Sequence, residues 1–280
     1  MAIQILSDLH LESPKAYDTF EVTPSAPYLA LLGDIGLAAR HKDDLLAFLT
    51  AQLRQFRAVL FVPGNHEAYH SSWPEVLSIL RDFERDVANN NSNNNNRESL
   101  PLGTFVLLDR AVFRPPDAPA TVVLGCSLFS AVPPESAAAV GDGLNDFYQT
   151  GAGWDVAAHN NAHARDLAWL NTRVAELEND AAGVETIVVL THWSPTRDLC
   201  AIDSRHVGSS ISSAFSTNLS WERCFTSPKV KVWAFGHTHH NCDFMVERGN
   251  GAGPLRLVTN QRGYYFQQSP GFDKMKKIDL

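Results

Sequence analysis

Side chains that bind metal ions recur in this sequence, each time directly after a short apolar segment. They occur as Asp8-Leu9-His10, Gly33-Asp34, Gly64-Asn65-His66-Glu67, Thr191-His192 and Gly236-His237-Thr238-His239. Carboxylate, imidazole and amide oxygen together suit manganese, iron or zinc better than calcium or magnesium. Each short pattern is weak alone, but their repetition at the ends of apolar segments predicts a metal centre.

The elements that carry these residues alternate between two kinds. Apolar runs over 3–6, 28–32, 58–62, 186–190 and 230–235 have the length and composition of buried strands. Apolar residues at helical spacing predict helices over 43–56, 73–88 and 155–179. This alternation indicates an α/β fold, in which ligands bind beyond the carboxyl ends of the strands. Residues far apart in the chain are therefore expected to converge there.

The remaining segments complete one expected domain over residues 1–280. Further strands are predicted over 104–108, 121–124, 243–246 and 255–259, with one near Tyr264. The asparagine-rich run 89–96 cannot form a core and is predicted to be a surface loop. The stretch 130–153 contains proline and glycine, and we expect an irregular insertion that covers the metals as a lid.

Composition excludes several classes of protein. With 44% hydrophobic residues, the 280-residue chain can bury a large core and is not expected to be disordered. The 23 basic residues against 31 acidic ones give a net charge of −8, which argues against broad binding of nucleic acid or anionic lipid. No apolar stretch is long enough to span a membrane, and the start does not read as a signal peptide. The 4 cysteines form no CxxC pair, so we expect a cytoplasmic protein.

The order of the motifs resembles the calcineurin-like metallophosphoesterase superfamily, whose blocks are DxH, GD, GNH(D/E), a lone H and GHxH. The resemblance runs from residue 8 to residue 239. It implies a four-layer α/β/β/α sandwich of two mixed sheets flanked by helices, with a two-metal centre at the strand ends. Many relatives carry Asp where this chain has Glu67, which leaves the role of Glu67 open.

The resemblance also implies which residues bind each ion. One ion would be held by Asp8, His10, Asp34 and His239, and the other by Asp34, Asn65, His192 and His237, with Asp34 bridging. The cofactors are then two divalent or trivalent ions, namely manganese, iron or zinc. Such a pair shares a hydroxide and clamps the phosphoryl oxygens for in-line attack. His66, beside a ligand, is the candidate that protonates the leaving group.

We therefore predict an enzyme that hydrolyses a small soluble phosphate ester, with a diester slightly favoured. A phosphomonoesterase or a protein phosphatase with the same centre is the alternative. A catalytically inactive scaffold is disfavoured because every motif position is filled. A DNA-repair nuclease would need a basic groove, which the net charge of −8 does not indicate.

Substrate contacts are predicted at Asp146, Trp193, His206 and Arg262. Arg262 has two interpretations, because its guanidinium suits either bidentate contact with a phosphate or a structural ion pair. His159 and His163 are spaced one helical turn apart, but no third ligand is near, so we expect a packed helix face.

Overall fold

The computed structural model describes residues 1–93, 101–151, 153–179, 183–249 and 251–280. Its first sheet has five strands in the order β13-β1-β2-β3-β4. They are β1 (Ala2–Leu6), β2 (Tyr28–Leu31), β3 (Ala58–Phe61), β4 (Thr104–Leu107) and β13 (Lys277–Asp279). β1 to β4 are parallel, and β13 pairs antiparallel to β1 at the edge.

The second sheet has six strands in the order β5-β6-β7-β8-β10-β9. They are β5 (Ala111–Phe113), β6 (Thr121–Cys126), β7 (Thr186–Thr191), β8 (Val230–Phe235), β9 (Asp243–Val246) and β10 (Leu255–Thr259). The four inner strands are parallel, and β5 and β9 are antiparallel edges. A short hairpin, β11 (Gly263–Tyr264) and β12 (Gln267–Gln268), follows this sheet.

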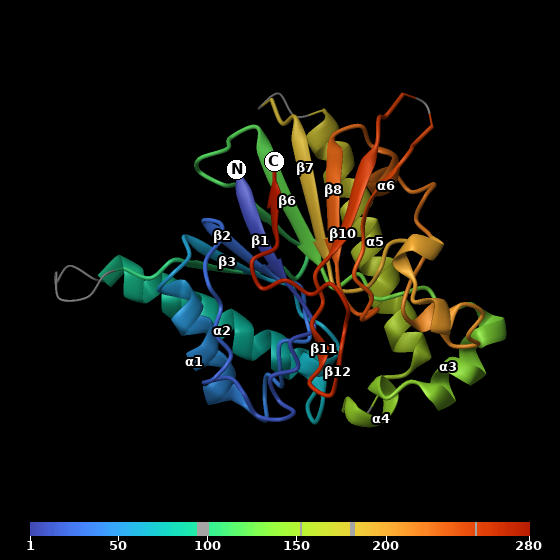
Figure 1. Cartoon of the computed structure of the whole chain (residues 1–280), viewed down its shortest axis with the longest axis horizontal. Coiled ribbons are helices and arrows are strands. Elements are labelled where there is room, and N and C mark those ends of the chain that lie inside the picture. The colour runs from blue at the N-terminus through green and yellow to red at the C-terminus, as the bar shows by residue number, and fades with distance from the viewer. Residues whose placement is uncertain (94–100, 152, 180–182, 250) are drawn as a thin grey trace.

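The two sheets pack face to face, and helices cover their outer faces. Because neighbouring side chains of a strand point to opposite faces, Ile3 and Ile5 lie between the sheets while Leu6 joins the cluster under the helices. The first sheet is covered by α1 (Lys42–Leu53) and α2 (Trp73–Asn93), and the second by α5 (Val156–Glu178) and α6 (Arg223–Thr226). The predicted four-layer sandwich of two mixed sheets is confirmed (Figure 1).

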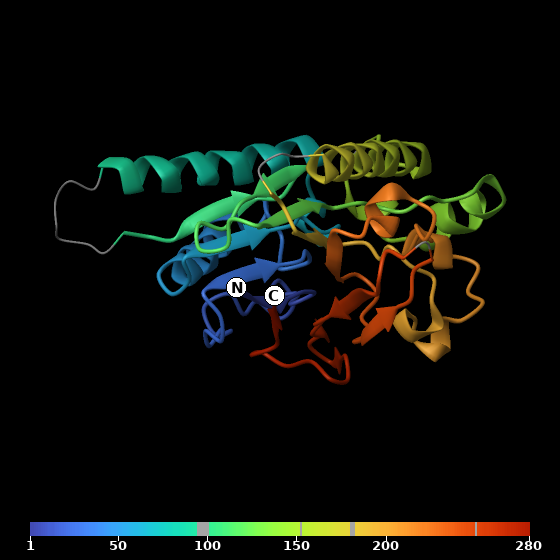
Figure 2. The ribbon, with the colours of Figure 1, turned by 90° about the horizontal axis from the view of Figure 1, so that it is seen from above.

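The carboxyl ends of the parallel strands from both sheets point to one region of the molecule (Figure 1). The two ends of the chain lie side by side away from it, and the Met1 ammonium group donates to the Leu280 carbonyl oxygen at 3.2 Å (Figure 2). The loops after the strands therefore meet where the sequence predicted convergence. Among the described residues, no helix combines the length and the hydrophobicity needed to cross a bilayer.

The structure corrects the prediction of a loop at 89–96, because α2 continues to Asn93. The Asn91 side chain explains part of this extension. Its amide nitrogen donates to the Leu102 carbonyl oxygen at 3.0 Å, and its oxygen accepts from the Leu102 N–H at 3.1 Å. These bonds tether the last turns of the helix to the returning chain. Residues 94–96 lie outside the described residues.

Two long connections hold more structure than the sequence indicated. The stretch 130–153 contains η2 (Pro134–Ser136), α3 (Ala137–Gly143) and α4 (Asp146–Gln149), although irregular structure was predicted there. Between β7 and β8 lie η3 (Leu199–Ala201), η4 (Ser204–His206) and η5 (Ser212–Ala214). Another short turn, η1 (His66–Ala68), follows β3. Residues of η1, α3, α4, η4 and η5 line one cavity together with residues that follow the strands.

Candidate metal centre

Five of the predicted ligands have a backbone in the left-handed region. Their φ angles are 53° at Asp8, 46° at His10, 54° at Asp34, 68° at His237 and 48° at His239. Residues other than glycine rarely adopt this conformation, and it persists only where the surrounding structure enforces it. This backbone conformation turns the side chains that follow the strands toward a common point.

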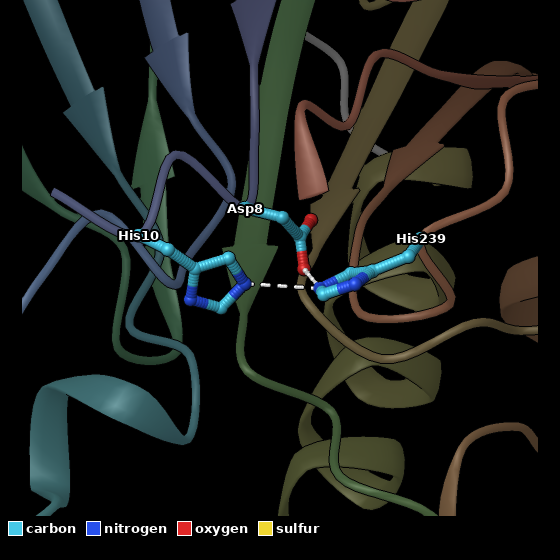
Figure 3. Close-up of side chains that lie close together, drawn as sticks. All are labelled: Asp8, His10 and His239. Carbon is cyan, nitrogen blue, oxygen red and sulfur yellow. Dashed lines mark hydrogen bonds and ion pairs between the residues drawn. The ribbon is translucent and has the colours of Figure 1, made fainter. Parts of the chain in front are cut away.

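The first group of side chains is Asp8, His10 and His239. Asp8 and His10 follow β1 of the first sheet, whereas His239 follows β8 of the second, and Figure 3 shows the three side chains pointing toward one another. His239 Nε2 lies 3.2 Å from Asp8 Oδ1 and 3.0 Å from His10 Nε2. Burial opposes ionisation of Asp8, but the hydrogen bond and the charge of His239 hold its pKa below the usual value.

The second group is Asp34, Asn65, His192 and His237. His192 Nε2 lies 3.0 Å from Asn65 Oδ1 and 3.4 Å from Asp34 Oδ1. Because a carbonyl oxygen only accepts, His192 Nδ1, at 2.7 Å from the Leu32 carbonyl oxygen, must carry its hydrogen. This bond aims Nε2 at the centre of the group, as in ligating histidines whose other nitrogen is hydrogen-bonded.

Asp34 lies between the two groups. Its Oδ1 faces His192, and its Oδ2 lies 4.0 Å from His10 Nε2 and 3.8 Å from His66 Nε2. Burial opposes ionisation, but the neighbouring imidazoles, first among them His66, hold the pKa of Asp34 well below its usual value. The Asp34 carboxylate is thus placed to contact ions in both groups.

Glu67 ties together the two loops that carry Asp34 and Asn65. This buried carboxylate accepts hydrogen bonds from the backbone N–H groups of Asp34 (3.0 Å), Ile35 (2.8 Å), Gly36 (3.3 Å) and Gly64 (2.6 Å). The sequence left the role of Glu67 open. The structure shows that Glu67 fixes the approach of the two loops.

The two glycines before the ligands permit that approach. A Cβ atom on Gly64 would lie 2.3 Å from Asp34 Oδ1. Gly33 has a φ of +87°, and a Cβ atom there would lie 2.3 Å from His192 Nδ1. Only glycine fits at these positions without movement of a predicted ligand.

His66 lies beside the metal-binding groups, and each of its ring nitrogens faces a carboxylate. Its Nδ1 is 2.8 Å from Glu12 Oε1, and the same oxygen lies 3.3 Å from His10 Nδ1. Burial opposes protonation, but the charges of Asp34 and Glu12 raise the pKa of His66 to about 9. Burial likewise opposes ionisation of Glu12, and the hydrogen bonds from His10 and His66 lower its pKa to about 2. One carboxylate therefore orients both a predicted ligand and the predicted acid.

Asp146 lies behind Asn65. The Asn65 Nδ2 group donates to Asp146 Oδ1 at 2.9 Å and to the Tyr69 hydroxyl oxygen at 3.1 Å, and the Tyr69 hydroxyl donates to Asp146 Oδ1 at 2.6 Å. These bonds turn the Asn65 amide oxygen toward His192. Burial raises the pKa of Asp146.

A cavity of about 320 Å³ opens beside the two groups. Its lining comprises Asp34, Asn65, His66, Tyr69, Gly143, Leu144, Asn145, Asp146, Ile202, Asp203, His206, Ser209, Ile211, Ser212, Phe215, Ser216, His237, Thr238, His239 and Tyr264. Two of the predicted substrate contacts, Asp146 and His206, are part of this lining.

The other two predicted substrate contacts are not part of this lining. Arg262 is buried, donates to the Leu9 carbonyl oxygen at 2.8 Å, and lies over the rings of Phe20 and Tyr265. Trp193 is fully buried and donates to the Ala214 carbonyl oxygen at 3.0 Å. These positions contradict direct contact with a substrate, because the desolvated guanidinium and the indole are used in packing.

Glu12, Tyr69 and Tyr264 lie beside predicted metal ligands, and the sequence analysis gave them no role. Glu12 and Tyr69 lie within a few residues of predicted ligands, which was the only signal for them. Tyr264 had no such signal, although its ring centroid lies 4.4 Å from that of His10 and 4.8 Å from that of His239. The position of Tyr264 depends on how the chain folds after the last motif, which the sequence does not indicate.

The residues of both groups fit metal ions. Each offers at least three ligand atoms within 4.8 Å of one another, Asp8 with His10 and His239, and Asp34 with His192 and His237. His237 Nε2 is buried and finds no hydrogen-bond partner among the described residues. A buried imidazole nitrogen left without a partner is costly, and a bound cation removes that cost.

Comparisons with known proteins agree with this geometry. The family model for calcineurin-like phosphoesterases matches residues 1–241. An uncharacterised protein of Acanthamoeba polyphaga mimivirus, L509, is 24% identical over 304 residues, covering 99% of this chain and 96% of that protein.

A crystal structure of similar fold is that of a phosphopantetheinyl hydrolase from Mycobacterium tuberculosis. It superposes with a TM-score of 0.62 at 16% identity, covering 94% of this chain and 89% of that chain. The match of the family model over most of the sequence shows that the chain belongs to the calcineurin-like phosphoesterases, metal-dependent hydrolases of phosphoester bonds.

Proposed function

We propose that this protein is a binuclear metal-dependent phosphodiesterase acting on a small soluble substrate. The observation that carries the proposal is the Asp34 carboxylate, whose two oxygens face two separate groups of ligand atoms. Asp8, His10, Asp34 and His239 hold one ion, and Asp34, Asn65, His192 and His237 hold the other. The mixed oxygen and nitrogen donors suit manganese, iron or zinc. When bound, the ions supply the Lewis acidity that activates water and neutralises phosphoryl charge.

His66 is the proposed general acid. Its Nδ1 donates to Glu12, which leaves Nε2 directed toward Asp34 at the cavity. An imidazole held in this way delivers a proton to the leaving oxygen of the ester. Glu12 keeps the ring oriented throughout, and Asn65 is oriented by Asp146.

The charge of the cavity lining supports a diester substrate over a monoester. Within the described part of the chain, no lysine or arginine side chain lines it. A monoester carries about two negative charges near neutral pH and a diester one, and a site without guanidinium groups gains less from the second charge. This supports a diester rather than a monoester as the substrate. A phosphomonoesterase or protein phosphatase with the same centre remains the alternative.

The proposal has three further parts, which concern a lid, the location in the cell and a class of excluded substrates. Residues 130–153 act as a lid, which is supported by the place of Leu144 and Asp146 in the cavity lining. The protein is cytoplasmic, which is supported by its four unpaired cysteines. Nucleic acid polymers are not substrates, in keeping with the net charge of −8.

The test is hydrolysis by the manganese-loaded protein of bis-p-nitrophenyl phosphate, p-nitrophenyl phosphate, and 2′,3′- and 3′,5′-cyclic nucleotides. A diester with a phosphopantetheinyl group belongs in the panel because of the structural neighbour. We expect hydrolysis of a diester that stops with a chelator and resumes with metal. A wide preference for the monoester would reverse the ordering, and metal binding without hydrolysis of any ester would support the scaffold instead.

A further inference from the structure

The cavity wall away from the metal ligands has an unusual composition for a phosphate site. It is supplied by the end of α3 with α4 and by the segment from Ile202 to Ser216, which includes η4 and η5. Its apolar members are Leu144, Ile202, Ile211 and Phe215, and its hydroxyl-bearing members are Ser209, Ser212 and Ser216. This wall, called here the distal wall, therefore offers apolar surface and hydroxyl groups.

The distal wall is built as a unit rather than as two loose loops. A small separate core of Val132, Val140, Leu144 and Ala214 joins the 130–153 insertion to the η5 region, with Ile211 and Phe215 packed against it. Gly143 is so close to η5 that a Cβ atom there would lie 3.1 Å from Ile211 Cγ2. Phe215 also stacks on His237, with ring centroids 4.9 Å apart, which joins this wall to the metal-binding side. A wall packed on both sides presents a preformed surface.

The charges of the distal wall do not suit a second anionic group. Asp203 and Asp146 are its carboxylates, and His206 is its only imidazole among the described residues. The nearby guanidinium of Arg205 does not line the cavity, and it is held by Asp203, with Nη2 and Oδ2 2.7 Å apart. An anion placed against Ile211 and Phe215 would lose water, and no lysine or arginine among the described lining residues would replace it.

From this wall, and from the place of the proposed acid His66 in the same cavity lining, we infer that the leaving alcohol of the substrate is uncharged and combines an apolar part with groups that hydrogen-bond to serine hydroxyls. The inference rests on the proposed phosphodiesterase activity and names its substrate class. Diesters whose leaving group bears a further phosphate or a carboxylate are poor substrates. Apolar burial against the wall holds the uncharged group, and the serines fix its orientation.

The test compares two synthetic diesters with the manganese-loaded protein. One is methyl 4-nitrophenyl phosphate, and the other carries an added carboxylate on the leaving ring beside the nitro group. We expect kcat/KM for the neutral ring to be higher by about tenfold or more, because the added charge is desolvated without a partner. Equal kcat/KM values for the two esters would overturn the inference.

A charge placed on the wall should reverse part of this preference. Ser212→Lys adds a cation to the lining, and we expect it to narrow the ratio of the two kcat/KM values about fivefold or more. Ser210→Lys is the matched control, since Ser210 is exposed, lies two residues away and is not in the lining. Its added charge is screened by solvent, and the ratio should stay within about twofold of the wild-type ratio.

Equal shifts in the two variants would overturn the inference, because they would show a general effect of net charge. Ser209→Lys, on the same wall, replaces Ser212→Lys if circular dichroism shows that the latter is unfolded. Failure of the wild-type protein to hydrolyse either ester would instead refute the proposed function, and the inference with it.

Discussion

At the scale of single residues, the centre depends on contacts that bring ligand loops closer than ordinary side chains allow. Gly64 lies against Asp34, and Glu67 binds four backbone N–H groups from both loops. Motif spacing predicted the candidate ligands, since each directly follows a strand. It could not predict the pairing of Glu12 with His66, because these residues are 54 positions apart and meet only in the folded chain.

Gly64→Ala tests the close approach of the ligand loops. The new methyl group would lie 2.3 Å from Asp34 Oδ1, so we expect a loss of at least about 1–3 kcal/mol of stability together with loss of bound metal. Gly141→Ala in α3 is the control, because its Cβ atom would meet only Val156 Cγ2 at 3.6 Å. That variant should be neutral or more stable by about 0.4–1 kcal/mol. Equal metal content in both variants, measured by mass spectrometry, would contradict this account.

Glu12→Gln tests the orientation of His66. Removing the charge weakens the bond to His66 Nδ1, and we expect kcat for a diester with a poor leaving group to fall about 10–100-fold at saturating manganese. An ester of 4-nitrophenol should be affected less, since its leaving group needs little protonation.

A double-mutant cycle separates this effect from a general one. In the His66→Ala background, Glu12→Gln should cause little further loss, because the ring that it orients is gone. If Glu12→Gln costs the same factor with and without His66, Glu12 acts only through the metal ligand His10.

At the scale of elements, the sequence predicted those whose pattern is local and missed those that depend on contacts with distant parts of the chain. The strands over 230–235, 243–246 and 255–259 were predicted with the observed bounds. The extension of α2 was missed because it depends on Asn91 pairing with Leu102, a contact outside the helix. The helices of the 130–153 insertion were missed because their small core is completed by residues near 211–215.

Helix α5 carries a buried histidine that should make stability depend on pH. His159 is fully buried, and its Nε2 accepts from the Ser130 N–H at 3.1 Å. Burial, with the charge of His163 adding to it, lowers the pKa of His159 from 6.5 to about 3. Below pH 6.5, His159 therefore binds a proton in the unfolded chain but not in the folded chain. The contribution of His159 to the free energy of unfolding is fully present above pH 6.5. It is lost by about 1.4 kcal/mol per pH unit as the pH falls toward 3.

His159→Gln isolates this effect, since glutamine keeps an acceptor for Ser130 and does not titrate. Between pH 7 and pH 5, wild-type stability should fall by about 2 kcal/mol more than that of the variant. Urea unfolding at the two pH values measures the difference. Parallel pH profiles would show that His159 is not held neutral.

At the scale of the whole molecule, the centre exists only because two sheets pack together. Asp8 and His239 come from different sheets and lie in ion-pair contact, with Asp8 Oδ1 and His239 Nε2 3.2 Å apart (Figure 3). The sequence predicted the sandwich through its family resemblance, while β13 was missed because its pairing with β1 joins opposite ends of the chain. The distal wall was likewise unpredictable, since it joins two distant connections.

The central claim is that these side chains hold two metal ions with Asp34 between them. The most direct measurement is anomalous diffraction from a crystal grown with manganese. The account predicts two peaks about 3.5–4 Å apart, one near Asp8, His10 and His239 and one near Asn65, His192 and His237. A single peak, or peaks away from these side chains, would contradict it.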